Sequence, residues 1–340
     1  MKVNNKRATL KDVANYSKLS ISTVSRYINS SGYVDEVSAR RIQAAIEVLD
    51  YRPNKFARSL KADATRQIML IIPDISNPYY ANIFREIQKL AIPQDYLPIL
   101  YDSCQVYDNE LKALRYAKEL NVDGVIYCSL YNNAQSLEQL SAIGRPAVVN
   151  NLFDQTLFDT LYSEAGKGIY TAAQYLINCG HKKIGYVGGS PSSDVNTRRK
   201  KGFMRAMSAA GVPMQDDWFF EMDFSMDAGY KAGLYFAALK NRPTAICAAN
   251  DVLAMGLITA FHERGIRVPE DISITGEDNI DFAAHYRPAL TTIENSSTHF
   301  AHTAYQMLME RLQKEYEGEP RKVICPRKLI VRESTKVLKD

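Results

Sequence analysis

A predicted helix over residues 21–29 carries hydroxyl groups and one guanidinium on a single face. The members of this face are Ser22, Thr23, Ser25 and Arg26. Hydroxyl and guanidinium groups donate hydrogen bonds to base edges in the major groove of DNA and to the phosphate oxygens beside it. These residue types at helical spacing therefore predict contact with a nucleic-acid duplex.

A second set of polar and aromatic side chains comes at the ends of apolar runs farther along the chain. These segments are 74–80, 150–151, 197–199, 250–251 and 276–279, and they contain tyrosines, amides, carboxylates and Arg199. Ligands of open parallel sheets bind beyond the carboxyl ends of the strands. A sugar requires flat apolar surfaces for its C–H groups and polar partners for adjacent hydroxyls, so this mixture predicts a sugar site.

Each member of the second set also has a structural explanation. Asn250 and Asp251 are residue types that cap helices, and Tyr79 and Tyr80 can close an apolar core. The basic run 198–201 is typical of a solvated helix face. Their joint occurrence at strand ends favours the ligand site.

Three short helices position the N-terminal polar face. The first covers 10–17, is capped by Thr9 with Asp12, and buries Leu10, Val13, Ala14 and Ser17. After a break at Lys18, Ser20 caps the second helix, whose inward residues are Ile21, Val24 and Ile28. Asp35 caps the third helix, with its apolar stripe at Val37, Ile42, Ala45, Ile46 and Leu49. This arrangement predicts a helix-turn-helix, and the alternative is a helical hairpin for protein contact.

Positive charge is concentrated in this N-terminal part. Residues 1–61 carry a net charge of +7 by count, whereas the whole chain carries +4, so the remainder is negative. Such a distribution is typical of a part that meets phosphate attached to a part that does not. Pro53 ends the unit, and Asn54 can cap a last short helix over 55–61.

The order of several motifs resembles one protein family. TLKDVA, STVSRYIN, YRPN and ARSLK resemble the head and hinge of the lac-repressor (LacI/GalR) family of bacterial transcription regulators. RPALTTI and PRKLIVRES near the C-terminus also fit this family. The resemblance covers nearly the whole chain.

The remainder of the chain alternates apolar runs with helix-length amphipathic segments. The runs cover 67–73, 97–101, 123–128, 145–150, 182–189, 244–250 and 271–276. This alternation predicts an α/β fold with parallel sheets covered on both faces. The resemblance implies two lobes like those of periplasmic sugar-binding proteins. We expect a head at 1–53, a hinge helix and linker at 54–65, a first lobe at 66–161 plus 292–325, and a second lobe at 162–291 plus 326–340.

The resemblance implies how the head and hinge contact DNA. Arg26, Ser22 and Thr23 would enter the major groove, and neighbouring polar groups would contact phosphates. Leu60 would insert into the minor groove, with Ala57 packed against the partner of a dimer. The full expected set is Thr9, Ile21, Ser22, Thr23, Ser25, Arg26, Asn29, Asn54, Ala57 and Leu60.

The resemblance also implies effector-binding residues. The family arginine lies three residues before a Gly-aromatic pair, here Arg199, and the family aspartate after DISxxGxD is Asp278. The complete expected set is Tyr79, Tyr80, Asn151, Arg199, Phe224, Asn250, Asp251 and Asp278. Two departures from the family stand out. Lys18 replaces the usual glycine, at a cost of about 1 kcal/mol if the turn is left-handed, and Glu277 replaces the usual aromatic.

Other function classes find little support in the sequence. There is no G-x-x-x-x-G-K-[ST], G-x-S-x-G or G-x-G-x-x-G pattern, so we expect no enzyme and no cofactor. His299 and His302 have no third metal ligand, and the five scattered cysteines predict neither a zinc site nor a disulfide. The chain has no signal-peptide pattern and no long apolar run, so we expect a cytoplasmic protein.

The sequence thus predicts a dimeric repressor that binds a two-fold operator and is released by a sugar. Two alternatives remain. One is a co-repressed regulator whose DNA binding is strengthened by a purine or a phosphocarrier protein. The other is a sugar-binding protein with a vestigial head.

Overall fold

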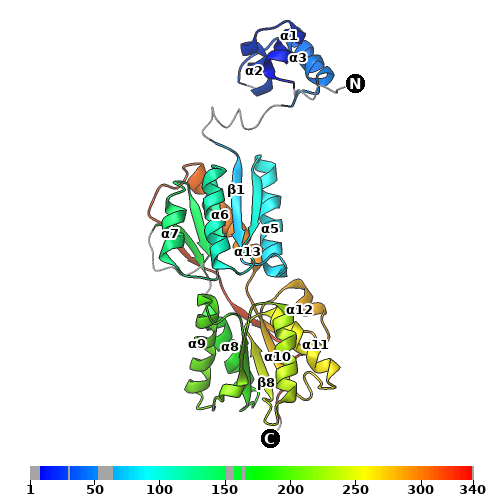
Figure 1. The fold of residues 1–340 in the computed structure, drawn as a ribbon, viewed down its shortest axis with the longest axis vertical. Coiled ribbons are helices and arrows are strands. Elements are labelled where there is room, and N and C mark those ends of the chain that lie inside the picture. The colour runs from blue at the N-terminus through cyan, green and yellow to red at the C-terminus, as the bar shows by residue number, and fades with distance from the viewer. Residues whose placement is uncertain (1–7, 30, 53–63, 151–156, 163–164, 339–340) are drawn as a thin grey trace. The chain divides into compact units, whose positions relative to one another are not determined.

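The computed structural model describes the chain except for residues 1–7, 30, 53–63, 151–156, 163–164 and 339–340 (Figure 1). The chain separates into two compact units, residues 1–65 and residues 66–340. Each unit is described by itself below. No helix in the described part of the chain is long and apolar enough to cross a membrane.

The N-terminal unit contains three helices around one small core. They are α1 (Leu10–Ser17), α2 (Ile21–Asn29) and α3 (Glu36–Val48). The three predicted caps are confirmed. Thr9 and Asp12 form a reciprocal capping box on α1, the Ser20 hydroxyl accepts from the Thr23 amide at 3.1 Å, and Asp35 accepts from the Ser38 amide at 2.9 Å. The core consists of Val13, Ala14, Val24, Ile42 and Ala45.

Two predicted core residues of this unit are in fact exposed. Ile21 is 49% exposed and Val37 is 69% exposed. Both lie in the first turn of their helices, N-terminal to the buried Val24 and Ile42. Three short helices enclose only a small core. The first turns of α2 and α3 therefore lie outside it, although their apolar residues keep the helical spacing.

Residues 66–340 form two six-stranded sheets. The first has the order β11-β5-β4-β3-β1-β2 and the second β12-β10-β9-β8-β6-β7. Only β12 is antiparallel, to β10, among the described pairs. The strands of the first sheet are β1 (Gln67–Ile72), β2 (Leu97–Asp102), β3 (Gly124–Cys128), β4 (Ala147–Asn150), β5 (Asp159–Tyr162) and β11 (Lys322–Ile324). Those of the second are β6 (Ile184–Gly188), β7 (Phe219–Glu221), β8 (Ala245–Ala248), β9 (Ser273–Asp278), β10 (Thr291–Glu294) and β12 (Lys328–Ile330).

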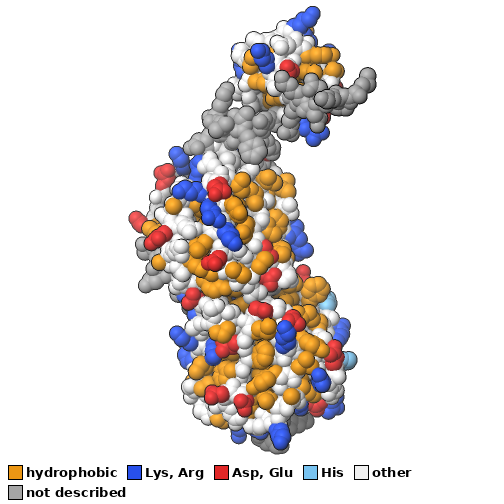
Figure 2. Space-filling model, viewed as in Figure 1, with side chains coloured by type: hydrophobic (Ala, Val, Ile, Leu, Met, Phe, Trp, Pro, Cys, Tyr) orange, Lys and Arg blue, Asp and Glu red, His pale blue; other side chains and the backbone are white. Residues whose placement is uncertain are grey.

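Helices cover both sheets, and we name each sheet with its helices a lobe (Figure 1). The first lobe has α5 (Pro78–Ala91), α6 (Tyr107–Glu119), α7 (Ala134–Ser141) and α13 (Ser297–Leu312). The second has α8 (Ala165–Asn178), α9 (Asp194–Ala209), α10 (Met226–Ala238), α11 (Asp251–Glu263) and α12 (Asp281–His285). On the face drawn in Figure 2, acidic and basic side chains are interspersed over both lobes. The predicted α/β class with two parallel sheets is confirmed.

The chain passes between the lobes three times. It crosses from β5 to α8, returns from β10 to α13, and crosses again from β11 to β12. The expected boundary at 291–292 falls inside β10, which belongs to the second sheet. The crossings matter for function because ligand contacts at them can affect both lobes.

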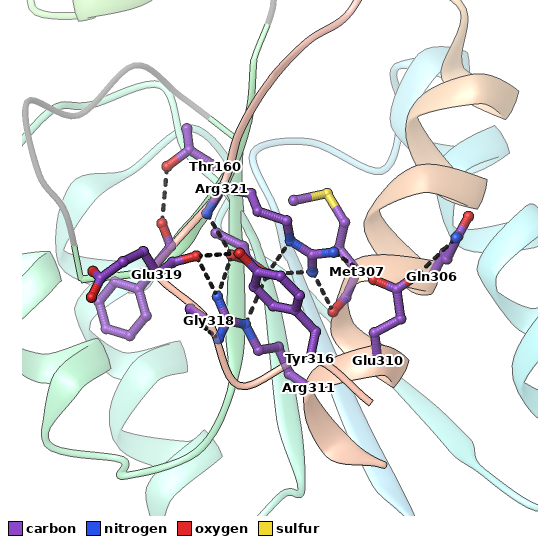
Figure 3. A network of polar contacts seen from close by, with 11 residues as sticks. Thr160, Gln306, Met307, Glu310, Arg311, Tyr316, Gly318, Glu319 and Arg321 are labelled. Carbon is purple, nitrogen blue, oxygen red and sulfur yellow. Dashed lines mark hydrogen bonds and ion pairs between the residues drawn. The ribbon is translucent and has the colours of Figure 1, made fainter. Parts of the chain in front are cut away.

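A dense polar network holds the end of α13 on the first sheet (Figure 3). The buried carboxylate of Asp159 accepts hydrogen bonds from Arg311 Nη2 at 2.8 Å and from Arg321 Nη2 at 2.7 Å. Arg321 also pairs with Glu310. The Tyr316 ring lies 4.4 Å from the Arg311 guanidinium carbon and 4.3 Å from that of Arg321. These contacts join β5, α13 and the segment before β11.

Candidate functional site

One cavity lies at the carboxyl ends of strands from both sheets. It encloses about 740 Å³ of space that no atom fills, part of which is open solvent. Its walls are formed by Pro73, Asp74, Asn77, Tyr79, Tyr80, Gln105, Ser129, Leu130, Asn150, Val195, Arg198, Arg199, Phe224, Asn250, Asp278, Asn295 and Arg327.

Six of the eight residues expected to bind an effector line this cavity. They are Tyr79, Tyr80, Arg199, Phe224, Asn250 and Asp278. Asn151 lies outside the described residues, and its neighbour Asn150 lines the cavity. The structure therefore brings together side chains from positions 79 to 278 that the sequence related through strand ends and through the family resemblance.

Asp251 is the exception, because it is not among the residues that line the cavity. Its fully buried carboxylate accepts a hydrogen bond from the Thr292 hydroxyl and another, at 2.9 Å, from the Ile280 amide. A Cβ at Gly276 would lie 2.3 Å from Asp251 Oδ1, so the carboxylate occupies the space that this glycine leaves. Both oxygens of Asp251 are thus used within the second lobe, and its side chain is not part of the cavity wall.

Asn250 both caps a helix and lines the cavity. Its side-chain oxygen caps α11 by accepting from the Leu253 amide at 2.9 Å, and the residue also lines the cavity. The cap fixes the side chain at the end of β8. Its position beside the cavity follows from that cap.

Arg199 is the best-defined polar group of the cavity. It projects from α9 and is 7% exposed. Its Nη2 donates to Glu277 Oε1 at 2.9 Å and lies 3.7 Å from Asp278 Oδ1. The guanidinium carbon lies 5.5 Å from the centre of the Phe224 ring, within the range of a cation–π contact. The guanidinium is thus fixed between two carboxylates and an aromatic face.

Asp278 has an unusual backbone and an unusual carboxyl. Its φ is 116°, in the left-handed region, and Asn279 follows with φ 51°. Such strain is concentrated at functional sites. Burial raises the pKa of the Asp278 carboxyl to about 6, although Arg199 opposes this shift. Asp278 is therefore ionised at neutral pH and gains a proton in mildly acidic solution.

Aromatic groups and direct contacts between the lobes border the same space. Tyr79 and Tyr80 of α5 stand edge to face, with ring centres 5.1 Å apart. The Phe224 amide of the second lobe donates to Gln105 Oε1 of the first lobe at 3.1 Å. On another edge, the Asn132 amide donates to Asp194 Oδ2 at 2.6 Å. Polar contacts between the lobes therefore lie close to the cavity.

Sequence reasoning missed several cavity residues. Arg327 and Asn295 lie in the third and second crossings respectively, outside any apolar run that ends at the cavity. Gln105 lies in a loop after β2. Arg327 had one available signal, because it falls within the PRKLIVRES motif that fits the family. Asn77 caps α5 and belongs to a strand-end segment that the sequence did indicate.

Six of the expected DNA-binding residues of the head lie on α2. Ile21, Ser22, Arg26 and Asn29 are described by the structure together with Thr23 and Ser25, and Ile21 is 49% exposed. Ser20 Oγ lies 2.7 Å from Ser22 Oγ and 2.8 Å from Thr23 Oγ1, so a hydroxyl cluster marks the start of α2. Thr9 is exposed at the start of α1. Asn54, Ala57 and Leu60 lie outside the described residues.

Comparison with known proteins gives the family. Residues 9–54 match the model for bacterial regulatory proteins, lacI family, and residues 173–335 match that for a periplasmic binding protein-like domain. A Photobacterium profundum protein named HTH-type transcriptional repressor PurR is 34% identical over 336 residues, covering 97% of this chain and 99% of that protein. The chain belongs to the lacI family of bacterial regulators. It is a DNA-binding transcription repressor, and its family is not one of enzymes.

Solved structures of lacI-family regulators have the same architecture. The Lac repressor bound to ONPG in the repressed state matches with a TM-score of 0.83 and 25% identity, over 97% of this chain and all of that chain. A regulator from Enterococcus faecium with bound ribose matches with a TM-score of 0.71 and 29% identity, over 80% of this chain and all of that one. Within the described residues, no group of three or more His, Cys, Asp or Glu side chains could hold a metal ion.

Proposed function

We propose that a small molecule bound in the cavity between the lobes sets the operator affinity of this repressor. The observation that carries the proposal is the arrangement of Arg199, held between Glu277 and Asp278 and against the face of Phe224. A buried, fixed guanidinium beside a carboxylate and an aromatic ring can hydrogen-bond and stack a small polar ligand at once.

For the ligand, we propose a purine that acts as a co-repressor. The relative with 34% identity over nearly the whole chain bears the name PurR, which indicates a purine. A flat purine ring could stack on Phe224, and its ring nitrogens and exocyclic groups could pair with Arg199 and Asp278. This reading replaces the sugar as our first candidate.

A sugar remains the second candidate ligand. It is favoured by the similar structure with bound ribose and by that of the regulator CelR in complex with cellobiose, which has 25% identity and a TM-score of 0.71. A sugar would use the same aromatic and polar groups. It would be expected to release the operator, whereas a purine co-repressor would strengthen operator binding.

We further propose that the protein binds its operator as a homodimer. A Lac repressor structure of the same fold is described as a dimer bound to operator. Two heads would present Ser22, Thr23 and Arg26 to the two halves of a symmetric site. A ligand that favours one arrangement of the lobes then changes how the two heads are held.

Selection of binding sites from a random duplex library tests this function. The purified protein is incubated with the library alone, with guanine, with hypoxanthine or with ribose, and bound duplexes are sequenced. We expect a two-fold symmetric motif that is enriched most strongly with a purine. If ribose abolishes the enrichment of the motif and purines do not change it, the result would favour the sugar-released repressor instead. An Arg26→Ala variant, which should lose sequence selectivity, serves as the control.

A further inference from the structure

Gln105 makes four hydrogen bonds in the cavity wall, one of them to the opposite lobe. Its backbone amide donates to the Pro73 carbonyl at 2.7 Å, and its carbonyl accepts from the Tyr131 hydroxyl at 2.6 Å. In the side chain, Nε2 donates to Asp74 Oδ2 at 3.1 Å and Oε1 accepts from the Phe224 amide at 3.1 Å. The first three partners belong to the first lobe and Phe224 to the second. The two ends of the Gln105 side chain therefore join the lobes.

The chemistry of a glutamine side chain suits this bridge. The Asp74 carboxylate needs a donor and the Phe224 N–H needs an acceptor, and an amide supplies one of each. A carboxylate at position 105 would have no donor for Asp74, and an alkyl side chain would serve neither partner.

The loop that carries Gln105 is strained and tightly held. Cys104 and Gln105 have φ values of 53° and 59°, in the left-handed region that favours glycine. The Asp102 carboxylate accepts from the Cys104 amide at 2.8 Å and from the Ile75 amide at 3.0 Å. The loops after β1 and β2 are thus tied together, and the backbone strain lies where the chain reaches toward the second lobe.

Phe224 is a fixed point of the second lobe. The next residue, Ser225, caps α10 with its hydroxyl. A Cβ at Gly189 would lie 2.3 Å from Phe224 Cε2, so the ring fills space that this glycine leaves. The other face of the argument is the Arg199 guanidinium, whose carbon lies 5.5 Å from the ring centre. The amide that Gln105 holds is therefore rigidly connected to the aromatic ring of the cavity.

Other contacts between the lobes use the backbone of the first lobe. The Leu130 carbonyl accepts from the Ser193 hydroxyl at 3.2 Å and from the Val195 amide at 3.3 Å. A carbonyl is present whichever residue stands at position 130. The contact of Gln105 depends on its side chain, so a substitution can remove it alone.

We propose that Gln105 is a positioning residue, which holds Phe224 of the second lobe against the ligand and so couples ligand binding to the arrangement of the lobes. Both residues line the cavity. A ligand that packs on the Phe224 ring favours the arrangement in which the hydrogen bond to Gln105 is made, and by linkage this hydrogen bond favours the ligand. The inference rests on the proposed ligand site and names the contact through which its occupation reaches both lobes.

Single substitutions at either end of the Gln105–Asp74 contact should weaken ligand binding. Gln105→Glu places two carboxylates at hydrogen-bond distance. Asp74→Asn makes two NH₂ groups face each other unless the new amide gives up its contact with the Ser76 amide. Each variant should raise the dissociation constant about tenfold, the value of roughly one hydrogen bond. Calorimetry on the full chain with guanine, hypoxanthine and ribose measures these constants.

The double variant Gln105→Glu with Asp74→Asn should recover most of the lost affinity. The new amide at position 74 donates to the new carboxylate at position 105, whose second oxygen accepts from the Phe224 amide. Damage to packing alone would make the effects of the two substitutions add. Recovery is therefore specific to a donor–acceptor pair.

Hydrogen exchange of residues 222–226 in the ligand-free proteins tests the reach of Gln105 into the second lobe. Gln105→Leu removes the acceptor, so the Phe224 amide should exchange about tenfold faster than in the wild-type protein. Gln94→Leu makes the same change at an exposed glutamine of the first lobe and should alter neither exchange nor affinity. Circular dichroism checks that each variant is folded.

Two results would overturn the inference. One is unchanged exchange of residues 222–226 in Gln105→Leu, and the other is a double variant that binds no more tightly than either single variant. If none of the three ligands binds the wild-type protein, the ligand class in the proposed function fails. The exchange result still decides separately whether Gln105 holds Phe224.

Discussion

Lys18 adopts a backbone conformation that suits glycine. Its φ of 55° and ψ of 40° place it in the left-handed region, where it ends α1 with its amide bonded to the carbonyls of Ala14 and Asn15. The family that the sequence resembles usually has a glycine at this turn, so the sequence left open a left-handed conformation for Lys18. The structure confirms that the turn is kept although the residue differs.

Lys18→Gly should therefore stabilise the head by about 1 kcal/mol, because a left-handed residue with a Cβ is strained by that order. Hydrogen exchange of the α1 and α2 amides in the full chain measures the effect, as slower exchange of the most protected amides. Lys18→Ala removes the same side chain but keeps the Cβ, so it should not slow exchange. Equal effects of the two variants would show that the charge of Lys18 matters and the strain does not.

The carboxyl of Asp278 should make ligand binding depend on pH. Burial raises its pKa to about 6, so lowering the pH from about 7 to about 5 converts it from a hydrogen-bond acceptor with a charge into a neutral acid. Ligand affinity should then fall over this interval and stay constant above it. Titration calorimetry at several pH values measures this. Asp278→Asn should bind weakly and without this pH dependence; a wild-type affinity that rises on acidification would contradict the assignment.

At the scale of the elements, apolar runs predicted the apolar strands but not the very short or the polar ones. All seven predicted runs contain strands, since β1, β3 and β8 are buried along most of their length. The strands β7, β11 and β12 have only three residues each and are partly exposed, so no run marks them. Arg327 was missed for the same reason, because it lies between two such strands. The buried strands β5 and β10 are not marked either, because half of their residues are Asp or Thr: Asp159, Thr160, Thr291 and Thr292.

Spacing alone also could not distinguish Asp251 from Asp278. Both are carboxylates at strand ends of the second lobe, and both are buried. Their surroundings differ because Thr292 and the Ile280 amide approach Asp251, whereas Arg199 approaches Asp278. Such contacts between distant segments depend on the order of the strands in the sheet, which local patterns do not contain.

The network around Asp159 should be a main source of stability for the first lobe. Asp159→Asn leaves Arg311 and Arg321 without their buried carboxylate and should lower the free energy of unfolding by about 3 kcal/mol. Urea unfolding followed by circular dichroism at neutral pH measures this. Glu315→Gln, an exposed carboxylate in the same region, is the matched control and should have no effect. A loss below about 0.5 kcal/mol for Asp159→Asn, on the scale of an exposed ion pair, would contradict this role.

The same carboxylate should contribute to acid sensitivity. Burial raises the pKa of Asp159, but the hydrogen bonds from Arg311 and Arg321 lower it more, so the net pKa lies below 3.8. Its stabilising contribution is present above about pH 4 and is lost as the pH falls through the lowered pKa. The difference in stability between the wild-type protein and Asp159→Asn should therefore shrink as the pH falls below about 4. A difference that stays constant would show that the charge is not involved.

At the scale of the whole molecule, the residues expected to contact DNA and the cavity belong to separate compact units. Residues 1–65 contain the polar face of α2, and residues 66–340 contain the cavity. Deletion of residues 1–65 should abolish duplex binding. The ligand dissociation constant should stay within about twofold of that of the full chain, which is a change in binding free energy of less than about 1 kcal/mol. Calorimetry on both proteins tests this. A core that no longer binds ligand would show that the head takes part in the site.

We propose above all that the cavity between the lobes binds the effector through Arg199. The most direct measurement is thermal unfolding of the full chain with guanine, hypoxanthine or ribose, for the wild-type protein and for Arg199→Gln. A ligand at about a hundred times its dissociation constant should stabilise the wild-type protein by about 2.7 kcal/mol, and this gain should disappear in Arg199→Gln. Equal stabilisation of both proteins by the same ligand would place the effector elsewhere and contradict the account.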